Sequence, residues 1–287
     1  MINKYKSIKY ASIVGIIGNL FLAVIKLIIG LITKSKAMMA DAINSVCDIF
    51  SSFMTFIGNK IASIPRDEDH NLGHGKAEYI YSMMISIVMA IMAITILKDS
   101  ILNIINKETI IYSNWLIVVC IITILTKLIL FIYTNNLAKK HKNILLKANS
   151  KDHLNDTLLT TINLISCILT KNNIYIFDSL AGIIISIWII ITAVKIYKES
   201  YNVLMDKALP IEIQNKVIDI IQQHQEIKKI NHFNSTPIGY KYQISFTIFL
   251  DGNMTTFKSH EIADNLEKEI DKKIEEIDLT IIHVNPI

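Results

Sequence analysis

The hydrophobic residues of this chain are gathered into long runs that short polar connections separate. Six runs are long enough to cross the ~30 Å hydrocarbon core of a bilayer as helices that rise ~1.5 Å per residue. They cover residues 10–32, 37–64, 79–97, 110–133, 143–169 and 174–197. The third run contains no charged residue, whereas the fifth has a polar face. The pattern predicts an all-α bundle of six transmembrane helices over residues 1–206.

After Asp206 the pattern changes to that of a small soluble domain, residues 207–287. Helical spacing and strict alternation of apolar residues predict five elements. In chain order these are a helix, two strands, a helix and a strand, at residues 211–224, 227–234, 241–250, 256–277 and 278–284. The order αββαβ predicts an α+β fold in which the helices cover one side of a three-stranded sheet.

Lysines are distributed unevenly over the connections between the runs. The richer set comprises Lys4, Lys6, Lys9, Lys139, Lys140, Lys142, Lys147 and Lys151. The poorer set comprises Lys34, Lys36, Lys107 and Lys171. Cytoplasmic connections carry the excess of positive charge, so we expect a multi-pass protein of the cell (inner) membrane with both termini in the cytoplasm.

The composition supports a membrane protein and argues against several other classes of protein. Hydrophobic residues make up 52% of the chain, and the mean hydropathy of +0.42 is above that of ordinary soluble domains. The net charge of +4 follows from the membrane topology and does not predict a nucleic-acid partner. Neither a nucleotide-binding glycine loop nor a nucleophile motif is present, so we expect no enzyme and no nucleotide partner. Cys47, Cys120 and Cys167 form no C-x-x-C pair and predict neither a disulfide framework nor a zinc-thiolate site.

Two polar pairs interrupt the apolar runs. Asn44 and Asp48 lie in the second run, and Asp152 and Asp156 lie in the fifth. Residues at i and i+4 share one helix face, so each pair presents two oxygen-bearing side chains together. Ionisable groups inside a membrane are costly, face the protein interior and mark ion paths. The two pairs would together form a four-oxygen cage for a divalent cation.

The donor set of this cage narrows the choice of ion. Hard cations such as Mn²⁺ prefer oxygen ligands, whereas imidazole and thiolate favour Zn²⁺. His153 follows Asp152 directly and therefore points away from the shared face. Three acids in a low dielectric are not all ionised without a cation, so metal release and proton uptake are coupled. This coupling predicts a metal/proton antiporter; the alternative is that the polar groups hold the bundle together by interhelical hydrogen bonds.

A second candidate site lies in the polar loop between the second and third runs. Asp67, His70 and His74 place two imidazoles at i and i+4 beside a carboxylate, and the neighbouring glycines allow a tight backbone. The alternative is an exposed loop whose histidines are incidental. Lys26 and Lys127 lie within apolar runs, where each either extends to the membrane interface or pairs with an acid elsewhere in the bundle.

Four segments, at residues 40–48, 65–78, 152–156 and 204–210, strongly resemble the cation diffusion facilitator family. They occur in the family's order and spacing over nearly the whole chain, and the Gly-His-Gly-Lys-Ala-Glu stretch in the second segment is highly specific. The resemblance implies a homodimeric, proton-coupled exporter of divalent transition metals with six spans and a cytoplasmic ferredoxin-like domain. It also implies that the protein is a transporter with no resident cofactor, whose substrate is the metal ion and whose counter-ion is the proton.

The resemblance also assigns sites. It implies a transport site on Asn44, Asp48, Asp152 and Asp156, and a loop site on Asp67, His70 and His74. Zinc-selective members commonly carry a histidine in the transport site, and its absence here resembles the bacterial manganese-exporting branch. Export of Zn²⁺, Fe²⁺ or Co²⁺ stays open, as does the different class of a non-transporting, membrane-bound metal sensor or scaffold.

In the tail domain the resemblance is weaker. The family's cytoplasmic metal site maps onto His232, Thr247, His260, His283 and Asn285. Thr247 stands where zinc-transporting relatives have a histidine, and Asn285 stands where they have an aspartate. We therefore expect a cytoplasmic site on His232, His260 and His283 to be weakened, altered or absent. The charge pair that locks the family's dimer near the membrane surface maps onto Lys76 and Asp206.

Overall fold

The structure, a computed structural model, describes residues 2–33, 36–106, 114–170 and 176–287. Inside the helices it leaves some side chains undescribed, those of Asn44, Cys47 and Cys167 among them. The chain forms two compact units. The first comprises Met1–Ile64 and Ala77–Tyr201, and the second comprises Pro65–Lys76 and Asn202–Ile287.

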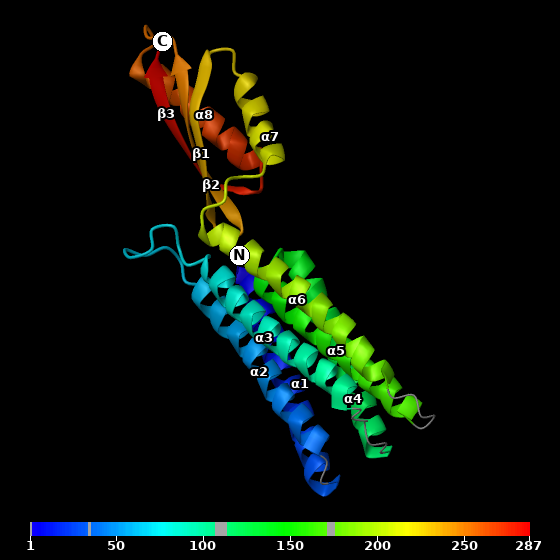
Figure 1. The fold of residues 1–287 in the computed structure, drawn as a ribbon. Helices are drawn as coiled ribbons and strands as arrows, with labels where there is room; N and C mark the ends of the chain where they lie inside the picture. Colours follow the sequence, from blue (N-terminus) through cyan, green and yellow to red (C-terminus); the bar gives the residue numbers. More distant parts are fainter. Residues whose placement is uncertain (1, 34–35, 107–113, 171–175) are drawn as a thin grey trace. The chain divides into compact units, whose positions relative to one another are not determined.

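The first unit is a bundle of long helices that lie side by side (Figure 1). These helices are α1 (Ile2–Thr33), α2 (Lys36–Ala62), α3 (Ala77–Asn106), α4 (Asn114–His141), α5 (Ile144–Thr170) and α6 (Ile176–Leu204). Several extend past the apolar runs that predict them, because a hydrogen-bonded helix continues into the polar interface beyond the hydrocarbon core. Among the described residues, three segments satisfy both length and hydropathy criteria for a span: Lys4–Ile29, Ala77–Ile105 and Asn114–His141.

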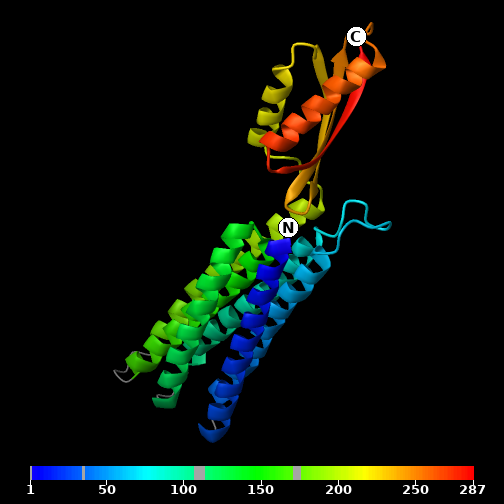
Figure 2. The same cartoon turned by 180° about the vertical axis from the view of Figure 1, so that it is seen from behind.

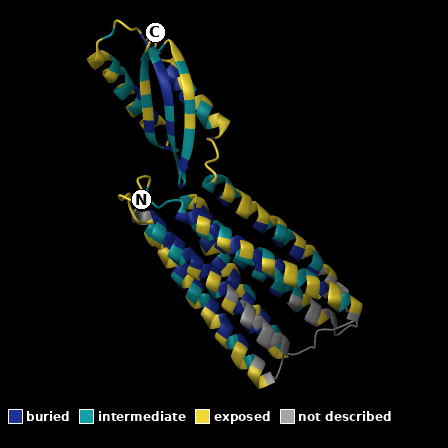
Figure 3. Ribbon diagram, turned by 60° about the vertical axis from the view of Figure 1, so that its left-hand side comes forward, coloured by how far each residue is buried: buried dark blue, intermediate teal, exposed yellow. Residues whose placement is uncertain are grey.

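In contrast to a soluble protein, the bundle exposes many large apolar side chains and buries many polar ones. Large apolar side chains such as Leu20, Phe21 and Ile129 are exposed, whereas Asn19 and Ser52 are fully buried. Figure 3 shows exposed positions along the outer faces of the helices. Lipid tails are as apolar as leucine, so a membrane protein gains by burying small and polar residues between its helices. The first unit is therefore a helical membrane domain.

The second unit contains a small sheet and two helices in the predicted order. The elements are α7 (Ile211–Gln222), β1 (Lys229–Ile238), β2 (Lys241–Leu250), α8 (Thr256–Lys273) and β3 (Ile277–Pro286). The strands lie in the order β1-β2-β3, with β1 antiparallel and β3 parallel to β2. Both helices pack on the same face of the sheet (Figures 1 and 2).

The core of this unit explains that arrangement. Alternate residues of β2, Ile244, Ile248 and Leu250 among them, are buried against Val217 of α7 and Leu266 of α8. The predicted apolar face of β2 is thus confirmed. The second helix ends four residues earlier than predicted, at Lys273. The reason is that Ile274 is extended and Ile277 begins β3, so both isoleucines enter the core instead of continuing the helix.

The loop between α2 and α3 belongs to the second unit. Arg66 Nη2 lies 2.7 Å from Asp278 Oδ2 on β3. Gly75 meets Gly239 of the β1–β2 turn so closely that a Cβ on Gly75 would lie 3.1 Å from the Cα of Gly239. Gly239 also has a φ of 64°, a conformation that side chains other than that of glycine rarely adopt. The loop that contains the predicted site is therefore held against β3 and the β1–β2 turn.

Candidate metal centres

Three carboxylates meet between α2 and α5. Oxygens of Asp48, Asp152 and Asp156 all lie within 4.8 Å of one another. Asp152 and Asp156 stand one helical turn apart on α5, and Asp48 faces them from α2. The structure thus brings together three of the four side chains that the sequence predicts for a transport site.

The fourth predicted ligand, Asn44, has its side chain outside the described part of the chain, so its assignment stays a prediction. A different amide lies close by. Asn155 on α5 is buried, and its Oδ1 has no hydrogen-bond partner among the described residues. The same holds for Asp152 Oδ2. Buried oxygens without donors are unfavourable unless a cation or water satisfies them. His153 is buried as well but does not join the carboxylate group, as its place on the helix predicts.

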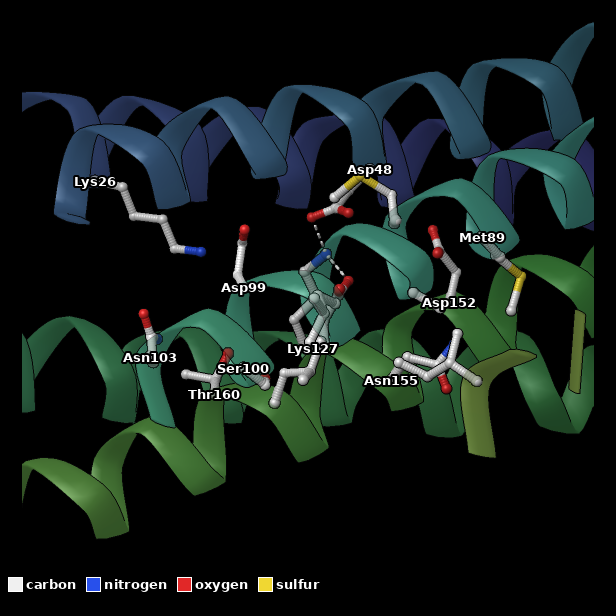
Figure 4. Close-up of a pocket in the computed structure, with 16 residues that line it drawn as sticks. Lys26, Asp48, Met89, Asp99, Ser100, Asn103, Lys127, Asp152, Asn155 and Thr160 are labelled. Atoms are coloured by element: carbon white, nitrogen blue, oxygen red, sulfur yellow. Dashed lines mark hydrogen bonds and ion pairs between the residues drawn. The ribbon is translucent and has the colours of Figure 1, made fainter. Parts of the chain in front are cut away.

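The carboxylates line a cavity of about 220 Å³. All the helices of the bundle contribute lining residues, including Lys26 of α1, Asp99 and Asn103 of α3, and Thr160 of α5. In Figure 4 Asp99, Asn103 and Lys26 lie toward one end of the cavity, and Asp152 and Asn155 lie toward the other. The polar residues of this lining form a polar cavity inside a bundle that is otherwise largely apolar.

Lys127 lies between two of the three carboxylates. Its Nζ lies 2.6 Å from Asp48 Oδ2 and 2.5 Å from Asp156 Oδ2, and its side chain is 1% exposed (Figure 4). Of the two possibilities that the sequence leaves open for this lysine, the structure shows the pairing with acids. Lys26 is also buried, and it donates to Ser45 Oγ at 3.0 Å. Sequence reasoning marks Lys127 as unusual but does not place it in the site.

The neighbouring contacts fix the position of α2. Asn19 of α1 donates through Nδ2 to the backbone oxygen of Asp48 at 3.0 Å and to Ser52 Oγ at 3.3 Å. Gly15 allows this close approach, because a Cβ there would lie 2.8 Å from Ser52 Oγ. Such supporting contacts orient the residues that hold a metal.

A second group of ligands forms in the loop. Oxygens and ring nitrogens of Asp67, His70 and His74 lie within 4.8 Å of one another. Asp67 Oδ1 is 3.5 Å from His70 Nδ1, and Asp67 Oδ2 is 3.6 Å from His74 Nε2. The backbone N–H of His70 donates to Asp67 Oδ1 at 2.7 Å, and this bond is the main reason why the pKa of Asp67 is lowered. The carboxylate is therefore ionised and available beside two imidazoles.

The predicted tail residues do not form a comparable group. His232, His260 and His283 are exposed, and no cluster of three potential ligands includes them in the part of the chain that the structure describes. Thr247 and His283 are partners in the β2–β3 register, whereas Asn285 pairs with Phe249. His232 stands at the irregularity of β1 between Asn231 and Asn234 and has a φ of 52°.

The predicted charge pair is present within one chain. Lys76 Nζ lies 2.6 Å from Asp206 Oδ1, and Asp206 has a φ of 54°. The pair joins the end of the α2–α3 loop to the segment that follows α6, and both residues belong to the second unit. Its part in a dimer stays a prediction.

Comparison with known proteins gives matches over nearly the whole chain. Residues 12–205 match the family model described as "Cation efflux transmembrane domain", and residues 209–287 match "Cation efflux protein, cytoplasmic domain". The manganese efflux system protein MneP of Bacillus subtilis (strain 168) is 27% identical over 96% of this chain and 95% of its own. The magnetosome protein MamM of Magnetospirillum gryphiswaldense is 26% identical over 92% of this chain and 84% of its own.

Among solved structures, the metal-bound C-terminal domain of the CzcD transporter from Thermotoga maritima matches the chain. It is 24% identical, covers 26% of this chain and 88% of its own, and has a TM-score of 0.26.

Proposed function

We infer the function of this chain from its family: it belongs to the cation efflux, or cation diffusion facilitator, family of metal transporters, and it is not an enzyme. We propose that it is a proton-coupled exporter that carries Mn²⁺ out of the cytoplasm. The observation that carries the proposal is the meeting of Asp48, Asp152 and Asp156 inside the membrane domain.

The choice of Mn²⁺ rests on ligand chemistry and on relatives. The described ligands of the site are carboxylate oxygens, which hard divalent cations prefer, and no imidazole joins them there. MneP and MneS of Bacillus subtilis, both described as manganese efflux system proteins, are each 27% identical to this chain over nearly its full length. Export of Zn²⁺, Fe²⁺ or Co²⁺ by the same antiporter is the alternative.

Proton coupling follows from the charge of the site. A bound divalent cation balances carboxylates that burial would otherwise make costly to ionise. When the ion leaves, proton uptake by the carboxylate group compensates part of the lost positive charge, so each transport step moves metal and protons in opposite directions. The cavity of about 220 Å³ that the three aspartates line has room for water molecules, which could carry these protons.

The remaining features fit one architecture. We propose that α1–α6 are six spans, that both termini and the 207–287 domain are cytoplasmic, and that this domain is ferredoxin-like. We further propose a homodimer that the Lys76–Asp206 pair supports, and a second metal site on Asp67, His70 and His74. The tail histidines would at most form a weak site. A non-transporting sensor would not need three acids inside the membrane, which argues against that class.

Cellular metal content tests the proposal. The chain would be expressed in bacteria that lack their own manganese exporter, and manganese and zinc would be measured by mass spectrometry after growth in excess of each metal. Wild type should lower manganese and protect growth, whereas Asp152→Ala should do neither at equal membrane abundance. Protection by Asp152→Ala would rule out the carboxylate group as the transport site, and lowered zinc alone would replace Mn²⁺ with Zn²⁺.

A further inference from the structure

Lys127 is a buried lysine whose ammonium lies among the proposed metal ligands. It contacts one oxygen of Asp48 and one of Asp156, at 2.6 Å and 2.5 Å, from a third helix, α4. An isolated buried ammonium is very costly, and two carboxylates are what make this position tolerable. In turn, the positive charge of the ammonium reduces the repulsion between the two negatively charged carboxylates.

The ammonium stands where a metal ion would stand. Divalent cations bind carboxylate oxygens at about 2.0–2.6 Å, close to the distances at which Nζ bridges the two Oδ2 atoms. Two positive centres cannot share the same pair of oxygens at such distances without strong repulsion. Metal binding to the Oδ2 atoms of both carboxylates therefore requires the ammonium to withdraw.

The surroundings give the ammonium somewhere to go. Lysine carries its charge on a flexible four-carbon stem. The cavity of about 220 Å³ that contains the aspartates is also lined by Asp99 and Asn103 of α3. A withdrawn ammonium can stay in this polar space. With the three aspartates ionised and Lys127 charged, the four groups carry a net charge of −2, which one divalent cation balances.

We propose that Lys127 is a resident cation of the transport site: its ammonium holds Asp48 and Asp156 while the site is empty, and the transported ion must displace it. This inference rests on the proposed function and adds a residue that sets affinity. Because the metal competes with a tethered charge, binding is weakened and release is assisted. Lys127 is a positioning residue, since it acts on the carboxylates and does not ligate the ion.

The test is Mn²⁺ binding to the purified full-length protein in detergent, measured by titration calorimetry. Two variants remove the charge: Lys127→Met, and Lys127→Gln, which keeps a hydrogen-bond donor for the carboxylates. Both should bind Mn²⁺ about tenfold or more tightly than wild type, because close charge pairs at a buried site are strongly coupled. Lys127→Arg, which keeps a resident charge, should not gain affinity.

Lys26→Met is the matched control, because it removes a buried lysine that lines the same cavity but donates to the Ser45 hydroxyl. It should change the affinity clearly less than Lys127→Met does. A thermal-shift series gives a second readout: Mn²⁺ should raise the melting temperature of both neutral variants more than that of wild type. If a neutral variant folds poorly, Mn²⁺ should restore it, since the ion replaces the missing charge.

Equal affinity in wild type, Lys127→Met and Lys127→Gln would overturn the inference and leave the proposed function intact. So would a neutral variant that excess Mn²⁺ fails to stabilise. If instead wild type neither binds nor transports Mn²⁺, the proposed ion is wrong, and the same titrations with Zn²⁺ and Co²⁺ decide the role of Lys127. A gain of affinity in the two neutral variants with any of these ions supports it.

Discussion

The ammonium of Lys127 lies 2.6 Å from a carboxylate oxygen of Asp48, although 79 positions separate the two residues in the chain. This contact joins α4 to α2 at the depth where α5 presents Asp152 and Asp156. It makes the candidate transport site a group of three acids and one base from three helices.

Replacing Asp48 or Asp156 with Asn should abolish Mn²⁺ transport. Each change removes one negative ligand and leaves Lys127 with a single carboxylate. Loss of supporting contacts alone costs about 10–100-fold in metal affinity, so loss of a ligand should cost at least about 100-fold. Calorimetry and vesicle flux would measure the two effects.

Asp99→Asn is the control for that experiment, because it removes an acid from the same cavity but outside the carboxylate group. It should reduce affinity far less than Asp48→Asn does. Equal losses in the two variants would mean that general negative charge, and not ligation, determines binding.

Asn44→His should shift metal preference from Mn²⁺ toward Zn²⁺. Imidazole is a softer ligand than a carboxamide oxygen and suits Zn²⁺ better. The measurement is the ratio of Zn²⁺ to Mn²⁺ flux in vesicles, with Asn44→Gln as the control that keeps an amide oxygen. An unchanged ratio in Asn44→His would show that position 44 does not select the ion.

Removal of Lys127 should slow turnover while tightening binding. The ammonium assists release, so Lys127→Gln should show a lower apparent KM for Mn²⁺ together with a lower maximal flux. Stopped-flow flux at saturating and limiting Mn²⁺ separates the two parameters. A variant in which both parameters match wild type would contradict the displacement of the ammonium by the ion.

The loop should keep its conformation until strongly acidic pH. The pKa of Asp67 is lowered in the folded chain, chiefly by the His70 N–H, so its contribution to stability is fully present above the ordinary value of about 3.9. That contribution is lost as pH falls below this value through the lowered folded pKa. The His70 amide resonance, followed by NMR, should therefore titrate below pH ~3.9. A midpoint above that value would contradict a lowered pKa of Asp67 in the folded chain.

Much of the fold is predictable because its signals are local. Hydropathy runs locate the six helices, and alternation along residues 241–250 locates the central strand β2 with its buried face. Helix ends are less predictable. The spacing of Ile274 and Ile277 predicts that the helix continues through them, whereas both residues pack in the core beneath the sheet. The β1 irregularity near His232 likewise depends on pairing with β2, which local spacing does not encode.

The candidate site divides in the same way. Spacing of i and i+4 predicts that Asp152 and Asp156 share a face, because that relationship lies within one helix. The meeting of these residues with Asp48 is a reasonable expectation, since acids inside a membrane face the interior. The pairing of Lys127 with these acids could not be predicted, because packing against neighbouring helices sets the rotation of α4 about its axis. That Asp99 of α3 and Asn155 of α5 line the same cavity likewise depends on how the helices pack, which local spacing does not encode.

The most direct test of the account is Mn²⁺ flux in proteoliposomes that carry a pH gradient, with a metal-sensitive and a pH-sensitive dye inside the same vesicles. Wild type should move Mn²⁺ and dissipate the proton gradient together, and Asp48→Ala should do neither. Mn²⁺ movement that leaves the proton gradient unchanged, or that continues in Asp48→Ala, would contradict a proton-coupled exporter built on these carboxylates.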